Sequence, residues 1–257
     1  MVEWYVFLFL CLVAFAAGFI DAIVGGGGLI QTPMGLILLP AFPVATVIGT
    51  LKIPAFCGTG IAARQYSKQV NLQWKLLAVM ATVAAVAAYA GSSLLLYVSN
   101  GFMKPLLLGV LSLLLVYTYL NKSFGLHSEK NHSEKEKMWY GFLMSLVIGF
   151  YDGFIGPGTG SFLVLSFVVL LGFDFLHASA HAKLVNMATN LGSIFLFFIH
   201  GKILWAVALP MAISNAAGGW VGARLAINRG NKFIRIFFLV VVIGTLIRFS
   251  YDVFWRN

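Results

Sequence analysis

Apolar residues run through this chain in long blocks with few polar interruptions. In the first half the blocks cover residues 4–24, 29–39, 44–63, 72–98 and 102–120. In the second half they cover residues 138–155, 161–172, 175–199, 203–227 and 233–254. Several exceed the ~20 residues that an α-helix needs to cross a hydrocarbon core of ~30 Å. The pattern predicts an all-α, polytopic membrane protein.

Two of these blocks are too short to span a bilayer. Residues 29–39 rise only about 16 Å as a helix at ~1.5 Å per residue, and residues 161–172 are little longer. Each block follows a glycine-rich stretch, at residues 25–28 and 156–160. Irregular backbone at membrane depth persists only where it is buried in protein or lines a wet cavity. We therefore expect broken or half-length helices after both motifs.

The two halves of the chain are copies of one another. A constant shift of 131 positions, the interval from Asp21 to Asp152, aligns the glycine-rich stretches. The same shift pairs Lys52 with Lys183, Trp74 with Trp205, and Asn100 with Asn231. Apolar sequences match by chance at Leu and Val, but not at Asp, Lys, Trp and Asn with one offset. We predict two transmembrane repeats, residues 1–120 and 138–257, joined by a charged linker at residues 121–137, as is common in secondary transporters.

Composition and charge agree with a bilayer environment. Hydrophobic residues make up 60% of the chain and charged residues 10%, against about 25% charged in soluble domains. The net charge of +9 comes from Lys and Arg gathered in short stretches between apolar blocks, at residues 64–75, 122–137 and 224–235. This is the distribution of cytoplasmic loops, and no basic-aromatic module points to nucleic-acid binding.

The basic stretches also constrain the topology. To place all three on the cytoplasmic side, each half must cross the membrane an odd number of times, which makes the repeats inverted and puts both termini outside. The first two segments of each half satisfy this either as a re-entrant hairpin or as two crossings. Both options stay open at this point.

The glycine-rich stretches are candidate anion sites. Each opens a helix whose first N–H groups lack intrahelical partners and whose dipole favours negative charge. The candidate substrate-binding residues here are Gly26, Gly27, Gly28, Gly158, Thr159 and Ser161. The alternative is that the glycines only allow helices to cross closely.

Lys52 and Lys183 lie inside apolar segments at matching positions of the repeat. A lysine at membrane depth is costly unless it faces a partner or a wet cavity, so both are candidate substrate-binding residues. Asn186 and Asn190 follow Lys183 at i+3 and i+7 and place a polar stripe on one helical face. The alternative is that the lysines lie near helix ends and snorkel to the lipid headgroups.

Asp21 and Asp152 each stand four residues before a glycine-rich stretch. They could pair with the lysines, carry a coupling proton, or anchor the helix break through hydrogen bonds. His177 and His181 have a spacing that serves metals, but their repeat counterparts are threonines and no further ligand completes a site. We therefore expect no metal and no cofactor, and we treat His181 as polar lining near a cavity mouth or as a coupling group.

At these motifs the chain resembles the sulfite exporter TauE/SafE family. The resemblance rests on residues 18–28 (GFIDAIVGGGG), 149–162 (GFYDGFIGPGTGSF) and 178–186 (ASAHAKLVN), with Thr189 and Asn190. It implies a carrier of the bacterial inner membrane for sulfite, sulfonates such as sulfoacetate, or related organic anions. Family members often have Thr-Asn-Lys where this chain has Thr50-Leu51-Lys52, so the first half-site is altered if that asparagine touches substrate.

Together these features predict a transporter of a small anion that works by alternating access in a lipid bilayer, with protons as a candidate coupling ion. A passive anion channel is the alternative within transport. An intramembrane enzyme is disfavoured, because the sequence shows no Ser/His/Asp, Cys/His or two-carboxylate constellation. The sequence leaves the oligomeric state open, a homodimer included.

Overall fold

The chain is all-helical wherever the computed structural model describes it, at residues 4–98 and 133–255. Side chains are described as far as residue 237, except that of residue 235. The helices are α1 (Trp4–Val24), α2 (Gly28–Leu38), α3 (Val44–Tyr66), α4 (Trp74–Tyr97), α6 (Glu134–Phe154), α7 (Thr159–Leu171), α8 (Phe175–Ile199) and α9 (Trp205–Trp255). The predicted segment at residues 102–120 and most of the linker lie outside the described residues.

The helix boundaries follow the hydrophobic blocks closely, with one difference at the start of α6. Helix α6 begins inside the predicted linker, because Ser133 and Glu136 form a capping box in which each side chain accepts the other's backbone N–H. The stretch labelled α9 consists of two helices that meet at a kink at Gly230, whose φ is 69°, inside the predicted gap between residues 227 and 233. That conformation is open to glycine and costly for other residues.

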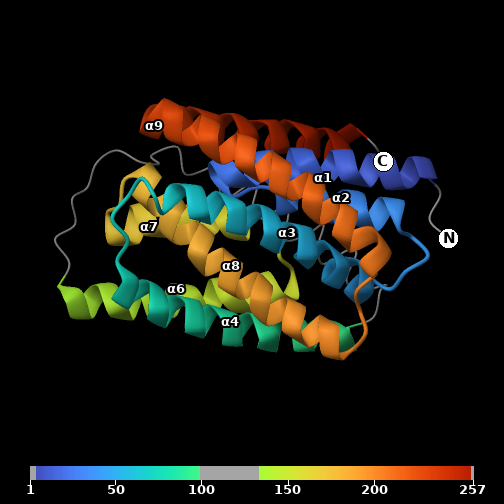
Figure 1. The fold of residues 1–257 in the computed structure, drawn as a ribbon, viewed down its shortest axis with the longest axis horizontal. Coiled ribbons are helices and arrows are strands. Elements are labelled where there is room, and N and C mark those ends of the chain that lie inside the picture. The colour runs from blue at the N-terminus through green and yellow to red at the C-terminus, as the bar shows by residue number, and fades with distance from the viewer. Residues whose placement is uncertain (1–3, 99–132, 256–257) are drawn as a thin grey trace.

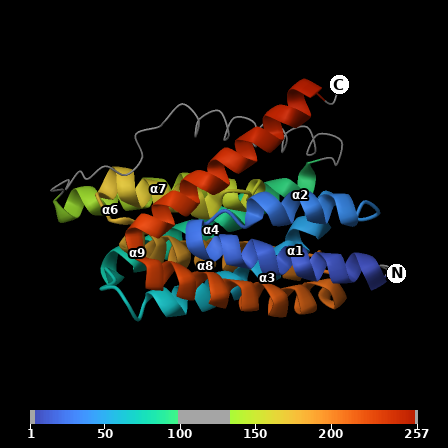
Figure 2. The same ribbon diagram turned by 90° about the horizontal axis from the view of Figure 1, so that it is seen from above.

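The first two helices of each half form a hairpin. In Figures 1 and 2 the start of α1 and the loop after α2 lie at the same end of the bundle, so the chain turns back at the break between α1 and α2. The start of α6 and the loop after α7 lie together at the opposite end. With only 11 and 13 residues, α2 and α7 are about 16 and 20 Å long at ~1.5 Å per residue, well short of the ~30 Å thickness of a hydrocarbon core.

The two halves exchange their outer helices. Helix α1 packs along α9, and α6 packs along α4, while α3 and α8 cross in the middle (Figure 1). A Cβ on Gly91 in α4 would collide with the carbonyl oxygen of Phe150, and one on Gly222 in α9 with that of Phe19. Gly91 and Gly222 are repeat counterparts, so both crossings depend on the same small residue.

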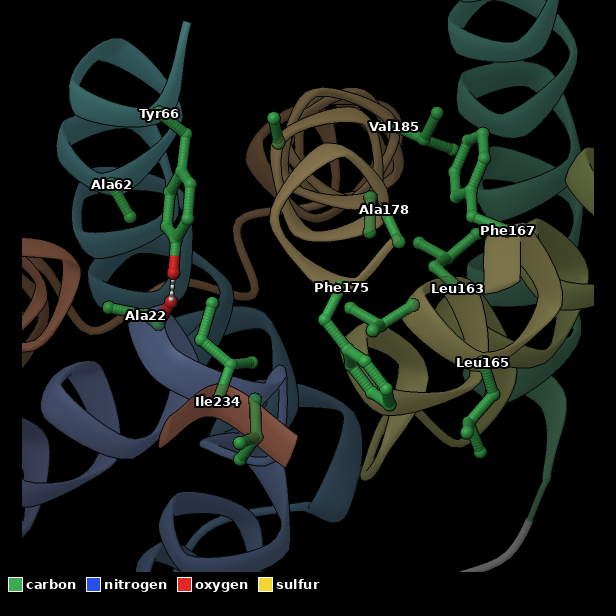
Figure 3. Packing of buried hydrophobic residues seen from close by; sticks show 14 of the residues in the cluster. Ala22, Ala62, Tyr66, Leu163, Leu165, Phe167, Phe175, Ala178, Val185 and Ile234 are labelled. Atoms are coloured by element: carbon green, nitrogen blue, oxygen red, sulfur yellow. Dashed lines mark hydrogen bonds between the residues drawn. The ribbon is translucent and has the colours of Figure 1, made fainter. Parts of the chain in front are cut away.

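The outer surface suits lipid. Four described helices, α1, α3, α4 and α8, are long and apolar enough to cross a membrane. Large apolar side chains such as Leu12, Val147 and Ile213 point outward. Inside, an apolar cluster joins α3, α7 and α8, and the buried Tyr66 donates a hydrogen bond of 3.0 Å to the carbonyl of Ala22 (Figure 3). This bond holds α3 to the end of α1, next to the first glycine break.

Candidate functional site

Both glycine-rich stretches interrupt the helices as predicted. Gly25, Gly156 and Gly158 have φ values of 79°, 91° and 85°, in the left-handed region that favours glycine. Neither Gly27 nor Gly28 donates its backbone N–H to another residue that the structure describes. The N-terminus of α2 therefore has free donors at the positive end of its dipole.

The two breaks contact each other. The Ser161 backbone N–H donates to the Gly25 carbonyl at 3.0 Å, and the Ser161 hydroxyl donates to the Val24 carbonyl at 2.9 Å. A Cβ on Gly25 would collide with the backbone of Gly160. Only glycines on both sides allow this approach, and it places the N-terminus of α2 next to the start of α7.

The four charged residues singled out in the sequence form two ion pairs between the halves. Lys52 Nζ lies 2.7 Å from Asp152 Oδ2 and also donates to the Asp152 carbonyl at 2.8 Å. Lys183 Nζ lies 3.1 Å from Asp21 Oδ2 and also donates to the Asp21 carbonyl. Each lysine therefore holds the side chain and the backbone of the aspartate that precedes the other half's glycine break.

Both pairs are buried, so the lysines do not snorkel to headgroups. The side chains of Lys52 and Asp152 are 7% and 4% exposed, and those of Lys183 and Asp21 are 1% and 16% exposed. Asp21 Oδ2 also accepts a hydrogen bond of 3.2 Å from Thr59. Burial of a lone charge costs several kcal/mol, which the partner charge and these added hydrogen bonds offset. The Asp21 pair is the looser of the two.

A cavity of about 60 Å³ lies where the breaks and ion pairs meet. It has room for several water molecules or one small anion, and it is far below the ~300–1,000 Å³ of pockets for drug-sized ligands. Of the residues expected to bind or couple, its lining includes Asp21, Gly27, Gly28, Lys52, Asp152, Gly158, Thr159, Asn186 and Asn190. The lining does not include Gly26, Ser161, His181 or Lys183.

The polar stripe of α8 supplies amide groups to the cavity wall. Asn190 Nδ2 donates to the Asn186 carbonyl at 2.9 Å, and Thr189 Oγ1 lies 3.3 Å from Asn186 Oδ1. No described residue hydrogen bonds to Asn186 Nδ2 or Asn190 Oδ1, with the side-chain amides oriented as assigned. One donor and one acceptor are thus available to a bound solute.

Two further polar residues at the cavity were missed by the sequence reasoning. Gln31 in α2 and Asn215 in α9 are 4% and 3% exposed. Asn215 Nδ2 donates to Gln31 Oε1 at 2.7 Å, and Gln31 Nε2 donates to the Leu51 carbonyl at 2.9 Å. Both are isolated polar residues within apolar blocks. A polar side chain inside a membrane-spanning segment is a candidate functional residue, so the reasoning applied to the lysines also applies to these two amides. Their repeat counterparts are Phe162 and Ala84, so the pair lies on one side of the site only.

His181 does not occupy the cavity mouth that the sequence suggested. It is fully buried beside the rings of Phe167 and Phe173, and its Nε2 accepts the backbone N–H of Gln73 at 3.1 Å. Its Nδ1 must then carry the proton and donate to the His177 carbonyl at 2.8 Å. This neutral ring ties α8 to the loop before α4.

The start of α8 is stabilised separately by Asp174, which caps the backbone N–H groups of Leu176 and His177. Partial burial acts to raise the pKa of Asp174, but hydrogen bonds from His177 and Leu176 outweigh it and lower that pKa below its usual value. Asp174 and His177 have no third potential metal ligand, since no group of three such residues occurs in the described part of the chain.

The chain is similar to one known protein family and to several proteins of bacteria. Residues 10–249 match the profile of the sulfite exporter TauE/SafE family. The probable membrane transporter protein ORF9 of Sinorhizobium sp is 35% identical, over 97% of this chain and 94% of its own length. The probable membrane transporter protein YfcA of Escherichia coli K12 is 34% identical over 93% and 88%, and YdhB of Bacillus subtilis is 23% identical over 94% and 100%.

No solved structure matches the chain. The family match covers both helix breaks, both ion pairs and the cavity, and the relatives named above are bacterial. The chain is a multi-pass membrane protein and belongs to the sulfite exporter TauE/SafE family of membrane transporters.

Proposed function

We propose that the protein moves a small anion, such as sulfite, a sulfonate or a related organic acid, across the membrane through the central cavity. The observation that carries the proposal is the meeting of two helix breaks around a small cavity whose lining includes charged and amide side chains, in an otherwise apolar bundle. An anion there would meet the Lys52 ammonium, the free N–H groups of Gly27 and Gly28, and the Asn186 amide. These are the groups that can replace the water which an anion gives up.

The arrangement also supports alternating access by inverted repeats. The two hairpins enter from opposite ends of the bundle, and α3 and α8 run in opposite directions in Figure 1. Repeats related in this way place their binding site at the interface between them, and a shift of one repeat against the other opens the site to either side. The exchanged ion pairs lie at that interface and would be remade as the repeats move.

The test is transport by the purified protein in proteoliposomes. Labelled sulfite, sulfoacetate and methanesulfonate are offered, with glucose as a neutral control. We expect saturable uptake of at least one of the three anions and no uptake of glucose. Flux that stays proportional to concentration would indicate a channel instead. Absence of flux for every anion would refute the proposed function.

Variants locate the site. Lys52 is the only lysine that lines the cavity in the described part of the chain. Lys52→Gln should therefore lower the apparent affinity for the anion at least tenfold, which corresponds to about 1.4 kcal/mol. Lys68→Gln is the matched control, because Lys68 is exposed in the loop between α3 and α4. Equal loss in both variants, or in neither, would argue against a site at Lys52.

A further inference from the structure

The wall of the cavity carries more negative than positive groups. Among the residues that the structure describes, the carboxylates of Asp21 and Asp152 both line it, but only one ammonium does, that of Lys52. Lys183 lies behind Asp21, is 1% exposed, and balances that carboxylate from the far side. The two pairs together are neutral, so the site offers an incoming anion no net positive charge.

The negative charge that a bound anion adds to this neutral site needs compensation. A solute anion in the 60 Å³ cavity would lie beside both carboxylates, and burial weakens the screening that water provides. A carboxylate next to another anion takes up a proton when its own charge becomes too costly. Uptake of a proton by one of the two carboxylates would remove this cost.

The geometry favours Asp21 for this role. Asp152 is 4% exposed and holds Lys52 at 2.7 Å, whereas the Asp21 side chain is 16% exposed and holds Lys183 at 3.1 Å. Both lysines also bond to the backbone carbonyl of their aspartate, so exposure and the ion-pair distance are what distinguish the two pairs. Asp21 is thus the carboxylate that a proton reaches more easily and whose pair separates at lower cost.

Among the described residues, few charged or titratable groups lie around Asp21. From α8 it meets Lys183, and from α3 it meets Thr59, with the Tyr66 hydroxyl bonded to the next carbonyl along the chain. Helices α2 and α7 contain no titratable residue. Among the described side chains of α9, the charged residues are Arg224, which lies over the Trp220 ring, Arg229 and Lys232. Across the cavity stand Lys52 and Asp152.

We propose that each anion is carried together with one proton, and that the proton resides on Asp21. This inference rests on the proposed transport function. The proton adds to the Asp21 carboxylate to give a carboxylic acid, and the Lys183 ammonium is then left uncompensated and balances the anion. On the opposite side the anion leaves and the acid returns its proton to water. The empty and the loaded sites carry the same charge, so a monovalent anion and its proton cross without net charge.

The experiment measures steady accumulation of labelled methanesulfonate in proteoliposomes. This anion is fully ionised in water, so any proton that moves with it must be carried by the protein. One proton per anion predicts a tenfold accumulation for each unit of pH difference, and none from a membrane potential set by potassium and valinomycin. Movement of the anion alone predicts the reverse, with roughly 50-fold accumulation for 100 mV.

Variants assign the proton to its residue. Asp21→Asn should move methanesulfonate with accumulation set by the potential and no longer by pH, while Asp21→Glu should keep the tenfold response. Asp174→Asn is the matched control. It removes a carboxylate that does not line the cavity, and asparagine also caps helices, so the native pH response is expected.

Each outcome of these measurements supports or overturns the coupling to a proton or its assignment to Asp21. Methanesulfonate accumulation driven by potential or by a sodium gradient in the native protein would overturn proton coupling and leave anion transport standing. An unchanged pH response in Asp21→Asn would remove Asp21 as the proton site. If Asp21→Asn does not fold, the native protein and Asp21→Glu still decide the coupling. Absence of flux for every anion would overturn both proposals.

Discussion

The Lys52–Asp152 pair should contribute strongly to stability, since it joins the two halves in a buried place. Both side chains are at least nine-tenths buried. Lys52→Met leaves the Asp152 carboxylate without a counter-charge, and the loss of one partner of a buried pair costs about 3–5 kcal/mol of unfolding free energy. Asp152→Asn should cost a similar amount. The double variant removes both charges and should cost less than the sum of the two by about 2–3 kcal/mol.

The assay is reversible unfolding in mixed detergent micelles, followed by circular dichroism, for the native protein and all three variants. The Glu134–Lys137 pair serves as the control cycle, because its nitrogen and oxygen lie 3.2 Å apart but the Glu134 side chain is 85% exposed. Its coupling energy should stay below ~0.5 kcal/mol. A coupling between Lys52 and Asp152 as small as that of the exposed pair would refute the reasoning.

Three further predictions follow from the same geometry. Gly25→Ala should prevent folding, because Gly25 has a φ of 79° and an added Cβ would collide with the backbone of Gly160. Gly201→Ala should lower the free energy of unfolding by only about 1–2 kcal/mol, because Gly201 has a φ of 62° but open space around it. Thermal unfolding of the two variants tests this difference. Gln31→Leu should weaken anion binding at least tenfold by removing the amide pair at the cavity, which is measured as a rise in the half-saturating concentration in transport. His200 and Gln69 lie in exposed loops at opposite ends of the bundle. In a background without native cysteines, His200→Cys and Gln69→Cys should therefore react with an impermeant maleimide from opposite sides of the membrane. Labelling of both cysteines from the same side would contradict the proposed topology.

The sequence was sufficient to predict most of the helices and the two breaks between them. Long apolar blocks predicted α1 and α8 to the residue, and the glycine-rich stretches correctly placed both breaks. These are local properties, because hydropathy and glycine content act within a few turns of helix. The exception was the start of α6, where a capping box extends the helix four residues into the charged linker.

The candidate site was found in part by the same local reasoning. Repetition in both halves marked Asp21, Lys52, Asp152 and Lys183, and the structure brings all four together around one cavity or directly behind it. Lone amides were overlooked because Gln31 and Asn215 have apolar counterparts in the repeat. Symmetry is thus a useful guide to shared residues and a poor one to those that make the two halves differ.

The sequence by itself determined that this chain is a helical membrane protein with two glycine-rich helix breaks and four charged residues inside apolar helices. Only the tertiary structure decided which charges meet. Lys52 and Asp152 are 100 positions apart and Asp21 and Lys183 are 162 apart, so no local pattern links them. The exchange of outer helices brings each aspartate to the lysine of the other half, and burial then enforces the pairing, since an ammonium or a carboxylate left alone among apolar helices is too costly to persist.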